Sequence, residues 1–289
     1  MLYAFFKTGF SLIKKALFKP IVYVVDKFYD NEVHSKHDKI AKDVNSLTCT
    51  PSAFLDKTRK EQVDILAVDI MLLVTNFSLI SGLIMLDFPM KNILFTIFYT
   101  YISTDLATGM LHFTLDNPSM KNHYLPTVRS LAWQFQDHHD KPYDNTLPPL
   151  LHTISNFSFA FVGPLICNYL YSYIFNINMG SYSLFIYLFG LLSQYVHRSI
   201  HYRDDQRSNF IKYLMRLKLL QNVENHHKHH KTYDCYYATL SGWTDPFIHI
   251  LQRVISKEIY QNTDWFKVSI SMLFLWIPIT YISIIKYLL

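Results

Sequence analysis

The amino-acid sequence predicts an all-α integral membrane protein, with four or five transmembrane helices and a His-rich helical cap on the cytosolic side. Half of the 289 residues are hydrophobic and 16% are aromatic, which is a high apolar content for a soluble enzyme. Several apolar segments have nearly the ~20 residues that a helix needs to cross a ~30 Å hydrocarbon core. Eight of the 14 histidines also cluster in motifs that are expected on one side of these segments.

The composition argues against several other classes of protein. Cys49, Cys167 and Cys235 show no pairing or zinc-type spacing, so we expect neither a disulfide framework nor a cysteine metal site. The formal charge of +5 is modest, and no Lys/Arg run or basic-aromatic repeat indicates a nucleic-acid surface. The first residues lack a basic stretch before their apolar residues and an evident cleavage site, so no signal peptide is predicted.

Residues 1–62 are predicted to form an amino-terminal amphipathic and polar region. Apolar residues such as Phe5 alternate with lysines such as Lys7, a pattern typical of a helix that lies on a membrane surface. A helix that packs against the body of the protein fits the same pattern, and both interpretations are open. Residues 31–62 are more polar, with a turn expected at Pro51.

Four long apolar segments define the predicted membrane domain, which covers residues 63–264. The segments are residues 63–86, 93–113, 156–177 and 182–196. Residues 265–289 form a separate carboxy-terminal hydrophobic helix. Pro278 lies inside this helix, which is expected either to span the bilayer or to lie at its interface.

The connections between the segments predict which side of the membrane carries the histidines. Short turns at 87–89 and 178–180 join the four segments into two helical hairpins. The amino-terminal region, the 114–154 loop and residues 202–264 then lie on one side. That side holds nearly all of the Lys and Arg, whereas the two short connections between the segments, residues 87–92 and 178–181, hold only Lys91. By the positive-inside rule, the histidine side is cytosolic.

The end of the second segment carries the first group of candidate site residues. Asp105, His112 and Asp116 fall on one helical face at i, i+7 and i+11. Charged groups near a membrane core are costly and are usually functional. We interpret His112 as a metal ligand, and Asp116 as a ligand or as a group that orients an imidazole. Asp105 is expected to hydrogen-bond the outer nitrogen of a liganding histidine, and Gly109 to allow close helix approach. An ordinary polar patch between helices is the alternative.

Two further histidine motifs follow along the chain. His138 and His139 are adjacent, so on a helix they differ by about 100° and reach one cavity only if it is wide or holds two ions. His197 and His201, at the end of the fourth segment, have the i, i+4 spacing that places both rings on one face.

The stretch from Asn225 to His230 contains four histidines in five positions. On a helix, His226 shares a face with His229 and His230, one turn further on. His227 lies about 100° away from His226, so the two are not expected to bind the same ion. We predict that His226 is the ligand, because it completes the HxxHH motif with His229 and His230. A short His-rich tract on the protein surface is the alternative.

The eight clustered histidines are too many for one metal ion, so two ions are predicted. A zinc hydrolase needs three or four ligands and an open position, whereas imidazoles in this number with oxygen chemistry favour iron. The other histidines that stand alone are interpreted as surface or structural residues, with His152 as the main candidate for an exception. They are His34, His37, His123, His152 and His249.

These motifs together resemble the membrane lipid desaturases, and most closely the Kua family. That family includes animal plasmanylethanolamine desaturase and a plant plastid desaturase. The resemblance covers roughly residues 65–255 and rests on Asp105, Gly109, His112, Asp116, Phe135, His138, His139, Pro142, His197, His201, His226, His229, His230, Tyr237, Gly242 and Trp243. Phe113 departs from the family pattern, which usually has Trp there. One residue rather than two separates the two His pairs, and the stretch from His230 to Tyr236 is one residue shorter.

The resemblance implies an O₂-dependent desaturase with two iron ions, and O₂ as co-substrate. Gly242 and Trp243 are more similar to the plasmanylethanolamine branch, which implies an ether-lipid substrate whose 1-O-alkyl chain becomes the vinyl ether of a plasmalogen. Electrons are then expected from cytochrome b5 or a similar donor, and the endoplasmic reticulum is the expected location. Two alternatives are open: a fatty-acyl desaturase or hydroxylase acting on a glycerolipid, and a non-catalytic membrane protein that binds or transports metal.

Overall fold

The computed structural model describes residues 57–86 and 92–288, and within these ranges the chain is helical, with no strand. A π-helical turn, Met272–Trp276, joins the last two helices. The expected amino-terminal region, residues 1–62, lies outside the described residues except for its last few. The α-helices are α3 (Arg59–Leu86), α4 (Ile93–Leu115), α5 (Pro126–Asp140), α6 (Leu150–Phe175), α7 (Gly180–Ile200), α8 (Asn209–Arg216), α9 (Val223–Thr232), α10 (Asp245–Val254), α11 (Lys257–Asn262), α12 (Trp265–Ser271) and α13 (Ile277–Leu288).

The long helices correspond to the predicted apolar segments. By length and composition, three described helices could cross a membrane: Arg59–Met85, Leu150–Phe175 and Trp265–Tyr287. Helices α4 and α7 are not among them, although the sequence predicted four or five spans. In α4, the hydroxyls of Thr100 and Thr104 donate to carbonyls one turn earlier, so these polar side chains are buried without unpaired groups.

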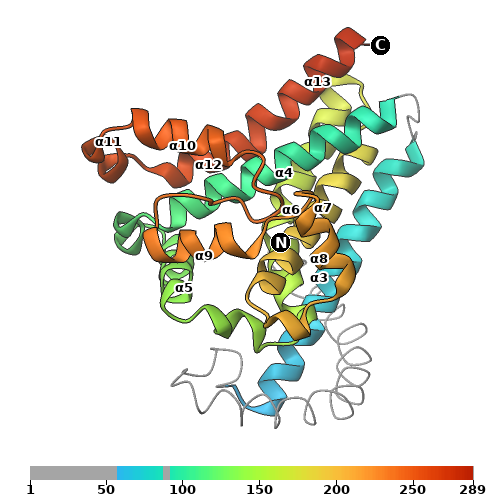
Figure 1. Ribbon diagram of the computed structural model, residues 1–289. Coiled ribbons are helices and arrows are strands. Elements are labelled where there is room, and N and C mark those ends of the chain that lie inside the picture. The colour runs from blue at the N-terminus through green and yellow to red at the C-terminus, as the bar shows by residue number, and fades with distance from the viewer. Residues whose placement is uncertain (1–56, 87–91, 289) are drawn as a thin grey trace.

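The order in which the long helices pack differs in part from the predicted hairpins. Helices α6 and α7 pack directly against each other, as predicted, but α3 packs mainly against α6 and α4 against α7 (Figure 1). The carboxy-terminal helix covers α4, and the hydroxyls of Thr96 and Tyr281 are 2.9 Å apart there. The core between α3, α6, α7 and α13 includes Leu83, Leu165, Tyr187 and Ile282.

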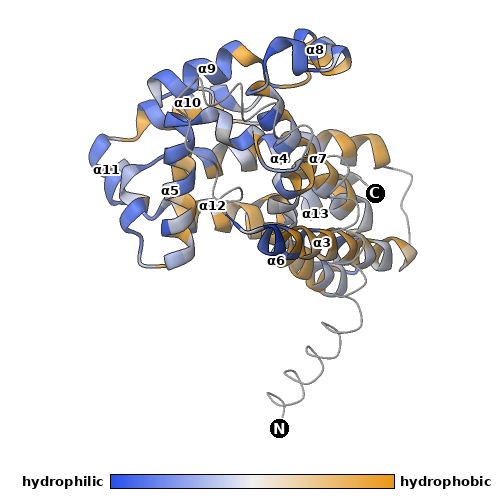
Figure 2. Cartoon of the chain, turned by 90° about the horizontal axis from the view of Figure 1, so that it is seen from below, coloured by the Kyte–Doolittle hydropathy of each residue, from blue (hydrophilic) through white to orange (hydrophobic). Residues whose placement is uncertain are grey.

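Helices α5 and α8–α11 form a polar cap over the ends of α4 and α7, and Figure 2 shows its contrast with the apolar long helices. Two buried arginines fasten the cap. Arg198 donates to the carbonyl of Thr146 at 2.6 Å. Arg207 donates to the carbonyls of Ser199 at 2.8 Å and Tyr202 at 2.6 Å. Because a helix end leaves carbonyls without partners, Arg207 fixes the end of α7, where two candidate ligands lie.

Candidate metal centre

Nine side chains that the sequence singled out converge where the cap meets α4 and α7. They form two groups, in each of which the candidate ligand atoms all lie within 4.8 Å of one another. Group 1 contains His138, His197, His201, His226 and His230, and group 2 contains His112, Asp116, His139 and His229. These nine are the complete membership of the metal-type clusters within the described part of the chain.

Helix geometry explains how each group is assembled. His112 lies in the last turn of α4 and Asp116 is its carboxy-terminal cap, one turn on. His197 and His201 have the same arrangement at the end of α7. Helix α9 begins at an effective cap, because the Asn222 side chain accepts from the backbone N–H of Asn225 at 2.7 Å.

Adjacent histidines are divided between the two groups. His138 belongs to group 1 and His139 to group 2, and likewise His230 belongs to group 1 and His229 to group 2. Since neighbouring residues on a helix point about 100° apart, each of these helices reaches two separate positions. The two groups are themselves close, because the ring centroids of His112 and His197 are 5.8 Å apart.

In group 1, the imidazole Nε2 atoms face one another across short distances. The Nε2 of His138 is 3.2 Å from that of His197 and 3.1 Å from that of His201. The Nε2 of His226 is 3.2 Å from that of His201 and 3.0 Å from that of His230. Two nitrogens bound to one ion at about 2.1 Å are roughly 3.0 Å apart at a right angle and roughly 3.4 Å apart at the tetrahedral angle. The spacing therefore fits a shared cation.

In group 2, a carboxylate takes the place of some imidazoles. Asp116 Oδ1 is 3.0 Å from His139 Nε2, and Asp116 Oδ2 is 3.3 Å from His229 Nε2 and 3.6 Å from His112 Nε2. The Nε2 atoms of His112 and His229 are 3.2 Å apart. Asp116 Oδ2 is buried without a hydrogen-bond partner among the described residues. A buried carboxylate oxygen that faces lone pairs fits a cation better than it fits an ordinary hydrogen bond.

The environment keeps several members of these groups in the protonation state that binds metal. Burial lowers the pKa of His138 and of His226 well below the ordinary value, and it lowers the pKa of His230 to about 2. Burial alone raises the pKa of Asp116, but the neighbouring imidazoles of His112 and His139 outweigh it and lower the pKa. Neutral imidazoles beside an ionised carboxylate are the form in which these side chains bind iron, zinc or copper.

A comparison with protein families decides the class of protein. A family model described as a lipid desaturase domain matches residues 101–280, which is more than half of the chain. The chain belongs to the lipid desaturase domain family. All nine residues of groups 1 and 2 lie inside the matched range. No curated protein and no solved structure matches the chain. The desaturase domain makes this chain an oxidoreductase that acts on lipid.

The desaturase domain fixes two of its imidazoles through backbone carbonyls. His112 Nδ1 is 2.9 Å from the carbonyl oxygen of Tyr237, and His229 Nδ1 is 2.7 Å from that of Cys235. A carbonyl only accepts, so each Nδ1 carries the proton and each Nε2 presents its lone pair to group 2. The sequence could not indicate these partners, because every residue has a carbonyl and the fold alone decides where it lies.

The expectation that Asp105 hydrogen-bonds a histidine is wrong. Its carboxylate accepts from the backbone N–H groups of Ser241 at 2.6 Å and Gly242 at 3.0 Å. It also accepts from the N–H of Thr244 at 2.9 Å and from its hydroxyl at 2.8 Å. Gly242 has φ +79°, a backbone conformation that side chains rarely allow. Asp105 therefore holds the turn that follows Tyr237, and it contacts the backbone of that turn rather than a candidate ligand.

Gly109 does allow a close approach, but from the cap rather than from another long helix. A Cβ at this position would lie 2.5 Å from Ile248 Cδ1 and 3.3 Å from the Cα of Ala238. The segment that carries the carbonyl of Tyr237 is thereby brought against α4. The close contact therefore helps to hold the Tyr237 carbonyl in the position where it contacts His112.

The remaining described histidines lie outside both groups, and three of them have ordinary structural partners. His227 is exposed and lies outside both groups, whereas His226 is fully buried in group 1. His152 Nδ1 is 2.9 Å from Asp69 Oδ2. His123 Nε2 is 3.3 Å from Asp264 Oδ1, and His249 Nε2 accepts from the N–H of Tyr236 at 3.1 Å. His34 and His37 lie outside the described residues.

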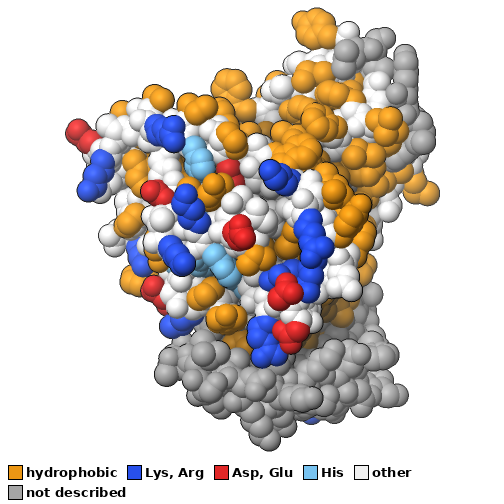
Figure 3. Space-filling view, viewed as in Figure 1, with side chains coloured by type: hydrophobic (Ala, Val, Ile, Leu, Met, Phe, Trp, Pro, Cys, Tyr) orange, Lys and Arg blue, Asp and Glu red, His pale blue; other side chains and the backbone are white. Residues whose placement is uncertain are grey.

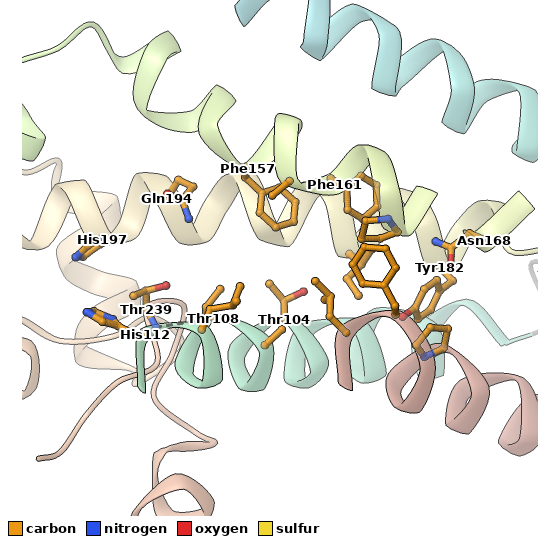
Figure 4. A pocket seen from close by; sticks show the side chains of 18 of the residues that line it. Thr104, Thr108, His112, Phe157, Phe161, Asn168, Tyr182, Gln194, His197 and Thr239 are labelled. Atoms are coloured by element: carbon orange, nitrogen blue, oxygen red, sulfur yellow. Dashed lines mark hydrogen bonds between the residues drawn. The ribbon is translucent and has the colours of Figure 1, made fainter. Parts of the chain in front are cut away.

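An apolar cavity opens onto both groups. It runs between α4, α6, α7 and the carboxy-terminal helix, with His112 and His197 at one end and Asn168 and Tyr182 at the other (Figure 4). Phe157 and Phe161 are among the side chains that line its middle. His197 and Tyr182 are 197 − 182 = 15 residues apart on α7, which at a rise of ~1.5 Å per residue is about 22 Å. The cavity therefore suits a long hydrocarbon chain whose one end lies beside the candidate ligands.

Proposed function

We propose that this desaturase uses O₂ and electrons to convert the 1-O-alkyl chain of an ether phospholipid into the vinyl ether of a plasmalogen. The observation that carries the desaturase mechanism is the cavity end, where His112 of group 2 and His197 of group 1 line the same apolar space. The ether-lipid substrate is supported by the resemblance of Gly242 and Trp243, together with the rest of the motif set, to plasmanylethanolamine desaturase.

Two iron ions are the proposed cofactor, one held by each group. Group 1 would supply five imidazoles, and group 2 would supply three imidazoles with the Asp116 carboxylate. Imidazole suits iron, whereas the carboxylate and carbonyl sets that select Ca²⁺ or Mg²⁺ are missing from both groups. When bound, the ions would supply O₂ activation and hydrogen removal. The chain's own residues hold the ions beside the cavity end and keep the alkyl chain in apolar surroundings.

The proposed reaction requires an external reductant. Removal of two hydrogens from adjacent carbons supplies two electrons, and reduction of O₂ to two waters takes four, so two further electrons and two protons must arrive from outside. The described residues form no β-strand, and a dinucleotide-binding fold is built on a β-sheet. We therefore propose a separate donor, cytochrome b5 or a similar protein, that docks on the cap.

The proposed topology places the cap in the cytosol and α4 and α7 in the membrane beside α3 and α6. Lys and Arg side chains are spread over the face of the cap in Figure 3, whereas hydrophobic side chains cover the neighbouring helices at the upper right. That charge distribution supports a cytosolic cap through the positive-inside rule. A multi-pass protein of the endoplasmic reticulum is the proposed setting, with residues 63–264 as the desaturase domain and 265–289 as a carboxy-terminal helix.

Analysis of metal and products tests this proposal. Protein purified aerobically in mild detergent is expected to hold two irons per chain and, with a reductant system, to convert a 1-O-alkyl lipid into a product two hydrogens lighter that releases an aldehyde in acid. A product heavier by one oxygen would indicate a hydroxylase, and a double bond in an ester-linked chain would indicate a fatty-acyl desaturase. Bound metal other than iron, without any product, would favour the non-catalytic alternative.

A further inference from the structure

Two polar side chains at the histidine end of the cavity have no hydrogen-bond partner among the described residues. Thr239 is 5% exposed, and its Oγ1 is buried without a partner. Gln194 lines the same end, and its side-chain amide forms no hydrogen bond within the described ranges. A buried hydroxyl without a partner is unfavourable, so its presence beside a cavity points to a ligand atom that completes it.

Three other polar side chains along the cavity are already paired. The Thr104 hydroxyl donates to the carbonyl of Thr100 at 2.7 Å, and the Thr108 hydroxyl donates to that of Asp105 at 3.0 Å. At the far end, Asn168 donates to the hydroxyl of Ser183 at 2.9 Å. The wall along α4 is therefore effectively apolar, and the unpaired hydroxyl of Thr239 stands out beside the candidate metal ligands.

The fold fixes both side chains close to the candidate ligands. Thr239 follows two residues after Tyr237, whose carbonyl contacts His112, and the N–H of Thr239 is 3.4 Å from the Thr108 hydroxyl. Gln194 precedes His197 by three residues on α7, about 4.5 Å along the helix axis. In Figure 4, Gln194 and His197 project from α7, and Thr239 lies across the cavity beside His112.

The donors define the chemistry of the atom that they would bind. The threonine hydroxyl and the NH₂ of the glutamine amide can each donate a hydrogen bond, and most of the surrounding lining is apolar. The matching ligand is an oxygen with free lone pairs at the head of an alkyl or acyl chain. The linkage oxygen of a lipid has this chemistry, either as an ether oxygen or as an ester carbonyl.

We propose that Thr239 and Gln194 hydrogen-bond the linkage oxygen of the lipid substrate and so set the position of the double bond. The proposal rests on the proposed desaturase function and adds its regiochemistry. Gln194 lies three residues, about 4.5 Å along the axis of α7, from His197, and an alkyl zigzag built from ~1.5 Å bonds advances about 1.25 Å per carbon. The double bond therefore forms within about four carbons of the linkage oxygen rather than in the middle of the chain.

Lipid binding measured without turnover tests the role of Thr239 and Gln194. Iron-loaded protein without a reductant is titrated with a 1-O-alkyl phospholipid, with a 1-acyl phospholipid, and with a carbon analogue in which CH₂ replaces the linkage oxygen. Wild-type protein is expected to bind one of the oxygen-containing lipids roughly 3- to 10-fold more tightly than the carbon analogue, as a single hydrogen bond implies. Which lipid shows the preference identifies the oxygen as ether or ester carbonyl.

Matched variants test whether Thr239 and Gln194 cause the preference for an oxygen-containing lipid. Thr239→Val keeps the shape of the side chain and Gln194→Leu nearly does, so each is expected to bring the preference close to 1-fold. Thr239→Ser restores the hydroxyl and should restore the preference. Thr104→Val is the control, because it removes a hydroxyl from the same cavity that is already paired with its own helix. With a reductant, Thr239→Val should give products with the double bond at several positions, where wild-type protein gives one.

Two results would overturn the inference. One is wild-type protein that binds the carbon analogue as tightly as both oxygen-containing lipids. The other is a preference that survives in Thr239→Val and in Gln194→Leu while both variants retain iron. These outcomes are separate from a failure of the proposed function: a wild-type protein that forms vinyl ether without any binding preference refutes only the role of the pair. A wild-type protein that shows the preference but forms a hydroxylated product refutes only the desaturation.

Discussion

Replacement of Asp105 by Asn tests whether this carboxylate supports the metal centre through the turn at residues 241–244. Asp105 is fully buried and its two oxygens accept four hydrogen bonds. Asparagine keeps one oxygen for Ser241 and Gly242, but its amide N–H₂ then faces the N–H of Thr244. One buried donor loses its partner, which costs about 1–3 kcal/mol, and the remaining bonds lose their charge, so we expect a total loss of about 2–5 kcal/mol.

The loss should also weaken metal binding, because the turn carries the Tyr237 carbonyl that orients His112. Loss of such a supporting contact typically lowers metal affinity by about 10- to 100-fold. Thermal unfolding in detergent and iron retention against a chelator measure the two effects. Asp205→Asn is the control, since that side chain is exposed and makes the same change of charge. If Asp105→Asn unfolds and retains iron like the control, Asp105 does not support the site.

Three further predictions follow from particular residues. Single Ala substitutions of the candidate ligands should abolish turnover without loss of the inserted protein, whereas His227→Ala and His249→Ala should stay active. An inactive His227→Ala variant together with an active His226→Ala variant would show that the wrong α9 histidine was chosen. The substitutions concern His112, His197, His201, His229 and His230. Burial first, and then the charge of Asp105, raise the pKa of Asp245 to about 7, so its stabilising contribution is present below about pH 4 and is lost as pH rises through 7. Asp245→Asn should remove that part of the decline in the unfolding midpoint between about pH 4 and pH 7, and an unchanged decline would contradict it. Glycosylation acceptors placed in residues 202–264 should stay unmodified, and modification there would reverse the proposed orientation.

The sequence predicted the features that depend on local spacing. The long helices follow from apolar runs of sufficient length, and the convergence of His197 with His201 follows from the i, i+4 rule. Features that depend on distant contacts escaped prediction. Asp105 shares a helical face with His112, so the spacing favoured a histidine partner, yet its partners lie 136 or more residues away. Thr239 and Gln194 belong to no motif, and only the folded cavity distinguishes them from other polar residues.

The division of adjacent histidines between the groups has a structural consequence for the metal centre. Helix α5 contributes His138 to group 1 and His139 to group 2, and α9 likewise contributes to both groups. A shift of either helix therefore moves ligands of both proposed ions together. On α9, His226 and His230 are one turn apart and share group 1, and His229 lies between them in sequence but faces group 2. A one-residue slip of α9 would turn these rings by about 100° and would place the exposed His227 where His226 now lies. The sequence offsets of one, three and four among His226, His229 and His230 thus suit the proposed pair of ions better than a single ion, because a single ion could use only one face of each helix.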